Sequence, residues 1–506
     1  RGSAQVQSAY LLNNVSLNSG LLSDNYTGIN TSSIQEVAVL TGGYNAEYGN
    51  ARSAIINVTT KEGAGTGIHG TVVGRFRPPG LYHFGRHIYS RQNYDWTHYD
   101  LAYWTAESQN QTSLFYKMNP DSLLAAWHLQ ITPSDTLADY DKRSEYENEA
   151  TLYGSLTDKL GFLVSGRYKR AVGIFPQVIP YNSEFNAQTN LNYQLTPSIK
   201  LSVNGLYGGW ESSELLAETN FNTLESARES QWLEPMVVTD PYDGFKYRLL
   251  GAIERQWPEL RRWTQVAAKV THTISANTFY EVQASFLRDK MDRSDRSGAI
   301  PEDKWSDRDD TRKMVNRFVD QSFFHFSDES ASNSFLVKAD VTSQVHLNHL
   351  MKAGTEFRTY DFRYRHWMAM YEGGQRWNLN NVFAGKPYEG ALYAQDKIEF
   401  SGLIVNVGLR TDFFHQNREA PKYMFDPLAF QTTTPGHDPD EPNGIPGAPE
   451  KVRTKLRVAL APRIGISHPI TDNTVLHFFY GHFYQRPSWT KMFGFPYINY
   501  TDNENT

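Results

Sequence analysis

Apolar and polar residues alternate along most of the chain after residue 63, and this alternation places them on opposite faces of extended strands. One such strand covers residues 68–77. Six strand pairs follow it, over residues 145–172, 184–212, 261–288, 333–366, 388–414 and 456–486. Each strand has roughly ten or more residues, a length that crosses a bilayer at a tilt. The pattern therefore predicts about thirteen long strands and an all-β-dominated fold.

The strand over residues 403–412 illustrates the alternation. Its apolar positions include Leu403 and Val405, whereas Asn406, Arg410 and Asp412 lie on the other face. The strand over 199–207 repeats this division, with Leu201 and Val203 opposite Ser202 and Asn204. We expect the apolar face to contact lipid and the polar face to line an interior.

The connections between these strands sort by length. Short turns lie near residues 157–159, 195–198, 272–277, 344–348, 400–402 and 469–473. Long segments lie near residues 173–183, 213–260, 289–332, 367–387 and 415–455. Short turns on one side and long loops on the other are typical of outer-membrane barrels. A soluble β-sandwich also has alternating strands, but its loops do not sort in this way. The sequence thus favours a transmembrane antiparallel β-barrel.

Composition narrows the possible functions. The formal net charge of −6 gives no electrostatic support for a nucleic-acid partner. The absence of cysteine excludes disulfides, zinc–thiolate sites and cysteine nucleophiles. Mean hydropathy is −0.55, and no apolar run approaches the length of a transmembrane helix. The sequence contains no phosphate-binding glycine loop, no nucleophile elbow and no pair of carboxylates within a recognisable catalytic motif. We therefore predict no enzymatic activity and no cofactor.

The region before residue 63 has a different pattern. Ser33 and Glu36 have capping-box spacing, which predicts a short helical turn. A β-prone run follows over residues 37–40 and ends at Gly42 and Gly43, which permit a tight turn. Residues 54–60 carry apolar side chains on both faces, as in a strand covered on both sides. These features predict a small buried α/β unit, which a soluble α/β protein could also contain.

The run from residue 33 to residue 63 resembles the second half of the plug domain of TonB-dependent outer-membrane receptors. The family pattern I-x-x-V-E-V-L-x-G is matched from Ile34, with Ala38 at the usual glutamate position. An A-x-Y-G-x turn and an I-N-V-x-T-K strand follow in order. The matched plug-motif residues are Glu36, Gly42, Gly43, Glu47, Tyr48, Gly49 and Asn50. Residues 391–412 and 461–487 look like barrel hairpins of the same family.

This resemblance implies a domain organisation. Residues 1–63 would be the C-terminal part of the plug, and residues 64–506 the N-terminal part of a barrel. The family barrel has 22 strands, so about thirteen would be present here and nine would lie beyond residue 506. No signal peptide precedes Arg1, so we expect the natural N-terminus upstream. The plug style looks most like that of receptors from Bacteroidota-type bacteria.

The resemblance also implies a function. The chain would belong to the outer membrane of a Gram-negative bacterium and import a scarce ligand such as a siderophore, glycan or peptide. TonB would engage a segment before Arg1, outer-membrane lipid would surround the barrel, and a surface lipoprotein is a further partner of this receptor type. Two alternatives remain open. One is a barrel with a structural or adhesin role in a complex, and the other is a secreted carbohydrate-binding β protein.

Candidate ligand contacts lie in the first long connection, residues 78–144, which is rich in aromatic residues. Tyr82, Trp96 and Trp104 offer large contact areas, and Arg86 suits an anionic group. The same aromatics could equally pack their own loop. His83 and His87 have helical i, i+4 spacing, but Gly85 weakens a helix there and no third ligand is in register. We therefore predict no metal site.

Overall fold

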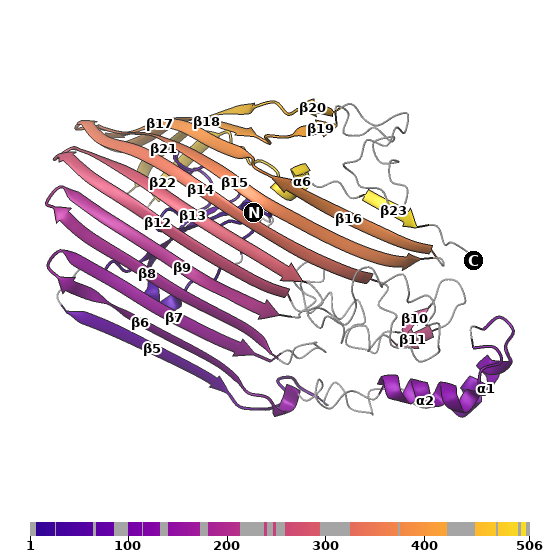
Figure 1. The fold of residues 1–506 in the computed structure, drawn as a ribbon. Helices are drawn as coiled ribbons and strands as arrows, with labels where there is room; N and C mark the ends of the chain where they lie inside the picture. The colour runs from indigo at the N-terminus through magenta and orange to yellow at the C-terminus, as the bar shows by residue number, and fades with distance from the viewer. Residues whose placement is uncertain are drawn as a thin grey trace.

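The computed structural model describes residues 7–25, 27–63, 67–85, 100–113, 115–131, 140–172, 181–212, 237–239, 246–248, 259–293, 324–372, 375–421, 451–471, 474–493 and 497–501. These residues form a small inner sheet and a large curved sheet (Figure 1). We call residues 7–63 the inner unit. No helix in the described part of the chain is long and apolar enough to span a membrane.

Thirteen strands of the large sheet are neighbours in sequence order, and we call these strands the wall. In chain order they are β5 (Ile68–Arg77), β6 (Glu145–Thr157), β7 (Leu160–Ala171), β8 (Asn182–Thr196), β9 (Ile199–Ser212), β12 (Glu259–Ser275), β13 (Thr278–Arg293), β14 (Phe324–His346), β15 (His349–Glu372), β17 (Tyr388–Phe400), β18 (Leu403–His415), β21 (Arg457–Thr471) and β22 (Thr474–Gly481). Every neighbouring pair is antiparallel. The large antiparallel sheet predicted from the alternation is therefore confirmed.

Five tight turns of the wall, the end of β21 and the start of β22 lie together at one end, and the strand ends that lead into the longer connections lie at the other end (Figure 1). The turn between β8 and β9, for example, needs only residues 197 and 198. Such a division arises when successive hairpins have the same orientation along the sheet. The loop asymmetry seen in the sequence is thus a property of the architecture.

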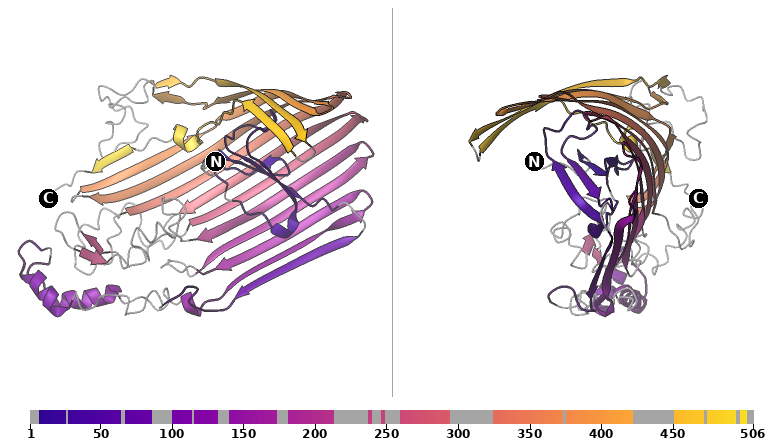
Figure 2. Two further views of the ribbon diagram at one scale, coloured as in Figure 1. Left: turned by 180° about the vertical axis from the view of Figure 1, so that it is seen from behind. Right: turned by 90° about the vertical axis from the view of Figure 1, so that its left-hand side faces the viewer.

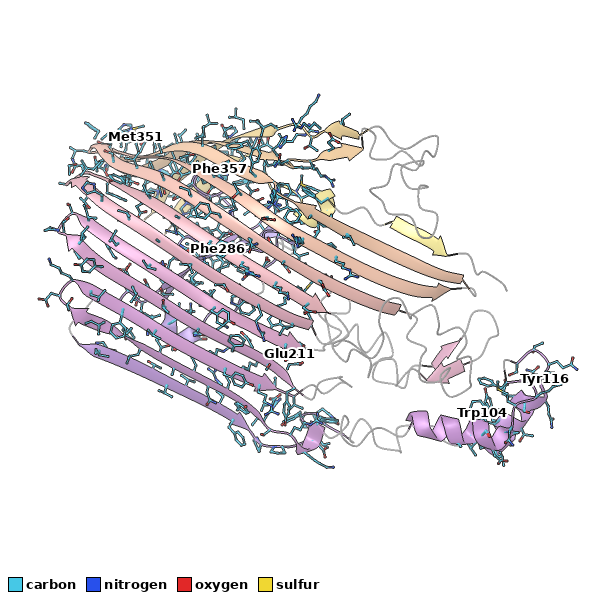
Figure 3. All side chains as sticks on the ribbon, viewed as in Figure 1. Trp104, Tyr116, Glu211, Phe286, Met351 and Phe357 are labelled. Carbon is cyan, nitrogen blue, oxygen red and sulfur yellow. The ribbon has the colours of Figure 1, made fainter. Side chains whose placement is uncertain are left out.

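The two faces of the wall differ in chemistry. Val203, Val407 and Leu409 lie on the face away from the inner unit and expose 42%, 44% and 46% of their surface. Phe286, Met351 and Phe357 have the same outward orientation (Figure 3). Ser202 and Asn204 alternate with them on the opposite, buried face. The alternation expected from sequence is confirmed on these strands.

The inner unit contains a four-stranded sheet in the order β2-β1-β4-β3. Its elements are β1 (Ala9–Leu12), β2 (Val15–Ser16), the 3-10 turn η2 (Thr31–Ser33), β3 (Ile34–Leu40) and β4 (Ile55–Thr60). Strand β4 pairs with β1 in parallel and with β3 antiparallel, so it is central. Ile55 and Val58 are buried at 1% and 8% exposure, which explains the apolar residues on both faces of this strand.

The inner unit lies on the concave side of the wall (Figure 2). Leu12, Leu17 and Val58 of the inner unit form one apolar cluster with Leu206 and Trp263 of the wall. Burial of these side chains provides a hydrophobic contribution to docking, on the order of 25 cal/mol per Å² of apolar surface.

Two local expectations were wrong. The helical turn predicted to start at Ser33 ends there instead, because η2 covers residues 31–33 and the Ser33 hydroxyl donates to the Asn30 carbonyl. The segment 367–387, predicted to be a long loop, is mostly strand. It contains the end of β15 and the strand β16 (Gln375–Gly385), which pairs with β15 and with β23 (Tyr497–Thr501). The pairing of β15 with β17 ends at Thr359, and beyond it β15 pairs with β16, so the backbone hydrogen bonds of this segment are made within a strand pair.

The remaining elements belong to the long connections. The first connection holds α1 (Leu101–Gln109), α2 (Pro120–Ile131) and the 3-10 turn η4 (Tyr140–Lys142). The other elements are the strand pair β10 (Val237–Thr239) and β11 (Lys246–Arg248), the pair β19 (Glu419–Pro421) and β20 (Lys451–Arg453), and the short helix α6 (Trp489–Phe493).

Candidate functional site

The main candidate site is the interface between the inner unit and the wall. Residues 44–50, in the connection from β3 to β4, reach deepest into it. Glycines start this connection, with φ values of +84° at Gly42 and +69° at Gly43, and Asn50 ends the turn at φ +52°. Residues other than glycine and asparagine rarely adopt this conformation. The sequence therefore shapes a turn whose backbone carbonyls point at the wall.

Arg410 of β18 binds this turn from the wall. Its guanidinium donates to the carbonyls of Ala46 and Glu47, both at 3.3 Å. It also pairs with Glu356 of β15 and, at 2.7 Å, with Asp412. Arg410 is only 1% exposed. A buried charge needs such partners, so the carboxylates fix the guanidinium and the guanidinium fixes the turn.

Arg463 of β21 binds the same turn from the neighbouring strand. One of its terminal nitrogens donates to the carbonyls of Tyr44, Asn45 and Tyr48, at 3.2, 2.5 and 2.9 Å. Its guanidinium also lies 5.2 Å from the ring centre of Tyr44. Two buried arginines of the wall thus satisfy five carbonyls of one turn.

Side chains of the turn add further contacts. The Glu47 carboxylate pairs with Lys352 of β15, and the Glu47 amide donates to Gln395 at 3.3 Å. A Cβ added at Gly49 would lie 2.4 Å from atoms of the Arg410 guanidinium. The close approach of this backbone to the wall therefore requires glycine at position 49.

Two tyrosines of the turn are strongly shielded from water. Burial raises the pKa of Tyr44 to about 12, against a smaller lowering by Arg463. Burial, together with the nearby Glu47 carboxylate, raises the pKa of Tyr48 to about 12. Both phenols therefore stay protonated at physiological pH, and the Tyr44 hydroxyl donates to the Ala51 carbonyl.

A second polar contact forms around η2. The amides of Thr31 and Ser32 donate to the carboxylate of Glu149 on β6, at 3.2 and 2.5 Å. The Ser32 hydroxyl lies 2.5 Å from that of Thr151, and the Asn30 amide donates to Gln188 of β8 at 3.0 Å. Glu149 is 3% exposed and accepts bonds from two backbone amides of this 3-10 turn.

A cavity of about 270 Å³ lies between the inner unit and the wall strands β12 to β21. Its lining is rich in paired charges of both signs, including Lys338, Asp340, Glu356 and Arg410. We find no group of three or more potential metal ligands within the described residues. The space between the two parts is therefore polar and charge-balanced, not a dry apolar core.

The structure brings together only some of the predicted site residues. Gly42, Gly43, Glu47, Tyr48, Gly49 and Asn50 lie in or beside the turn, whereas Glu36 is exposed on β3. Tyr82 packs on its own loop, where its hydroxyl donates to Arg143 and its ring lies 4.0 Å from the Arg77 guanidinium. Arg86 and Trp96 lie outside the described residues.

Trp104 is fully buried between α1 and the following turn (Figure 3). Its ring meets Tyr103 and Phe115 edge-on, with centroids 5.1 and 5.5 Å apart. This packing accounts for Trp104 without a ligand. Ligand contact by Tyr82, Arg86, Trp96 or Trp104 remains a prediction.

Several interface residues were missed by the sequence reasoning. Lys352 and Glu149 could have been placed on the inner face by their parity, because each alternates with lipid-side residues. Leu206 and Trp263 gave no such signal, because they are apolar residues on a polar face. Only the position of the inner unit explains them.

Comparison with known structures supports this architecture. The ferric-catecholate import receptor Fiu of E. coli K12 in its open form superposes with a TM-score of 0.53 at 10% identity. The match covers 96% of this chain and 64% of that one. The ferric yersiniabactin uptake receptor FyuA of Yersinia pestis gives 0.54 at 9% identity, with coverages of 94% and 56%. The unliganded ferric citrate transporter FecA gives 0.52 at 10%, with coverages of 94% and 54%.

At such identities these likenesses establish the fold alone, and the chain spans less than two thirds of each structure. Among curated protein sequences, none matches this one. The family model described as "TonB dependent receptor-like, beta-barrel" matches residues 209–505, which is more than half of the chain. The sheet of alternating strands is accordingly part of an outer-membrane β-barrel, and the protein belongs to the TonB-dependent receptors of Gram-negative bacteria, a family of receptors and not of enzymes.

Proposed function

We propose that this protein imports a scarce solute across the outer membrane, with residues 1–63, which include the inner unit, acting as the plug of a barrel that begins at residue 64. The observation that carries the proposal is the docking of residues 44–50 on Arg410 and Arg463 inside the concave wall. A folded unit held in the lumen blocks free diffusion, and it must move before a large solute can pass.

The chemistry of the interface supports movement. Most contacts of the turn are hydrogen bonds and ion pairs to polar side chains, and two of these side chains, Arg410 and Lys352, also line a charged cavity. Water can replace such partners when the unit shifts, so the net cost is limited to about 1.5–3 kcal/mol for each bond to a charged group. Pulling by TonB from the periplasm would supply the work. The solute would be a siderophore, glycan or peptide, and external loops together with the turns of the inner unit would bind it.

A reversible crosslink tests this proposal, because residues 1–506 contain no cysteine that could form a competing disulfide. The Ser32 and Thr151 hydroxyl oxygens are 2.5 Å apart, so the pair Ser32→Cys and Thr151→Cys suits a disulfide. The full-length protein would be expressed in a strain lacking its own copy, on the limiting medium where that strain grows poorly.

The oxidised double variant should fail to restore growth, whereas a reductant and each single variant should restore it. Full growth with the crosslink formed would contradict gated import. That result would favour the alternative of a barrel with a structural or adhesin role, in which the inner unit never moves.

A further inference from the structure

The segment after β22 turns back into the lumen. Residues 482–493, which we call the inward segment, contain the short helix α6 (Trp489–Phe493). Trp489 and Phe493 are 0% and 2% exposed, although they follow the last strand of the wall. They share an apolar cluster with Leu21 of the inner unit and with Tyr360 and Phe362 of β15. The inward segment therefore contacts both parts of the molecule.

Three contacts join the inward segment to the inner unit. The Arg486 amide donates to the Asn50 side-chain oxygen at 3.2 Å. The Thr490 amide donates to the Leu21 carbonyl at 3.3 Å. The Phe483 and Tyr44 rings have centroids 4.5 Å apart. These contacts are neutral, and two of them hold the same turn that Arg410 and Arg463 bind.

The contacts of the inward segment with the wall side are stronger. The Arg486 side chain pairs with Glu389 of β17 at 2.6 Å and donates to the Tyr360 hydroxyl at 3.1 Å. Its guanidinium also lies 4.1 Å from the Trp489 ring centre. At the end of α6, Arg418 donates to the carbonyls of Met492 and Phe493, at 2.6 and 3.1 Å. Arginine thus satisfies carbonyls left free at a helix end.

These strengths determine which contact breaks first. Hydrogen bonds to charged groups contribute about 1.5–3 kcal/mol each, against about 0.5–1.5 for neutral ones. The inward segment is therefore fixed to the wall. Its neutral hydrogen bonds to the inner unit are weaker than its charged hydrogen bonds to the wall, so we expect them to break first. Residues 484–487 also line the cavity between the two parts, so the segment lies beside the space that movement would enlarge.

We infer that the inward segment holds the inner unit in its closed position, and that Arg486 is the positioning residue that fixes the segment for this task. This inference rests on the proposed function and adds to it a specific restraint on plug movement. Arg486 acts through its own backbone: its side chain is fixed on Glu389, which places its amide on Asn50.

Hydrogen exchange of the full-length protein in detergent, without ligand or TonB, tests the inference. The reporters are the amides of Glu47 and Tyr48, which are bonded to Gln395 and to the Asn45 carbonyl. Asn50→Gly removes the side-chain acceptor and keeps the positive φ, whereas Asn50→Asp keeps an acceptor oxygen. Arg486→Gln removes the ion pair with Glu389. Arg457→Gln is its matched control, because Arg457 is an exposed arginine lining the same cavity.

Exchange at the reporters should become about tenfold faster in Arg486→Gln and about fivefold faster in Asn50→Gly. Asn50→Asp and Arg457→Gln should stay near the parent rate, and amides of the β6–β7 hairpin should be unchanged in every variant. If Arg486→Gln does not fold, the two Asn50 variants still decide the question. Parent-like exchange in Asn50→Gly would overturn the inference. This measurement requires no transport, so its result is separate from that of the growth test.

Discussion

The two faces of the wall come from the same strands, yet they reverse the usual relation between polarity and burial. On the outer face Val407 and Leu409 are almost half exposed, whereas Arg410 on the inner face is 1% exposed. A soluble protein would bury the former and expose the latter. The comparison shows that one face is made for hydrocarbon and the other for a polar, protein-filled lumen. The effect of a substitution should therefore depend on which of two adjacent residues is changed.

The largest effect should come from the inner face, at Arg410. Arg410→Met would leave the carboxylates of Glu356 and Asp412 and two turn carbonyls without their partner. Removing one member of a buried ion pair costs about 3–5 kcal/mol. Urea unfolding of the protein in detergent should show a loss of this size. Arg457→Met, at an exposed arginine of β21, is the control and should change stability little.

On the outer face, Val405→Arg should cost up to about 2–4 kcal/mol, because its charge meets hydrocarbon, a cost that is largest near mid-bilayer. Asn406→Arg, one residue further along β18, should be tolerated in the polar lumen. Unfolding from lipid vesicles would measure both free energies. Equal costs at the two positions would contradict the assignment of the faces.

A smaller effect is expected at Gly49, where the backbone of the inner unit lies close to Arg410 of the wall. The added Cβ of Gly49→Ala would lie 2.4 Å from a guanidinium that two carboxylates hold in place. Such overpacking costs about 1–3 kcal/mol. Gly80→Ala, where an added Cβ meets no atom within 4 Å, is the matched control. Equal melting temperatures for the two variants would show that the Arg410 side chain can move away from the added methyl group at little cost.

The smallest effect should come from Glu47→Gln, which keeps a polar side chain near Lys352 but removes its charge. Both partners are largely buried, with side chains 16% and 20% exposed, so we expect a loss of about 1 kcal/mol. Glu399 pairs with Lys397, and their side chains are 50% and 44% exposed. Glu399→Gln should therefore have no measurable effect on the free energy of unfolding. Urea titration of both variants would compare the two environments directly.

Much of the fold could be predicted from sequence because a strand has a period of two. Alternation alone placed Leu201, Val203, Leu403 and Val405 on one face, and loop lengths indicated which end of the wall carries the tight turns. The same reasoning failed at β16, because the alternation from Trp377 to Asn380 is too short to distinguish a strand from a loop. It also failed at Ser33, because capping-box spacing occurs both at the start of a helix and by chance.

The site was predictable only in part. The glycines and Asn50 were visible because backbone conformations with positive φ restrict the residue type. The partners of the turn were not visible, since Lys352, Gln395 and Arg463 lie more than 300 residues from residue 47 and meet the turn only in the folded structure. The inward segment was hidden for a related reason: residues 482–486 continue the alternation of β22, yet the strand ends at Gly481.

The sequence by itself determined the antiparallel strands, the polarity of the two wall faces and the tight turn of the inner unit, because each depends on the local chain. Tertiary structure decided which carbonyls the buried arginines satisfy, which carboxylates hold those arginines, and where Leu206, Trp263 and the inward segment find their partners. Those contacts are set by the curvature of the sheet around the inner unit. Curvature depends on all the strands together, so no local pattern encodes it.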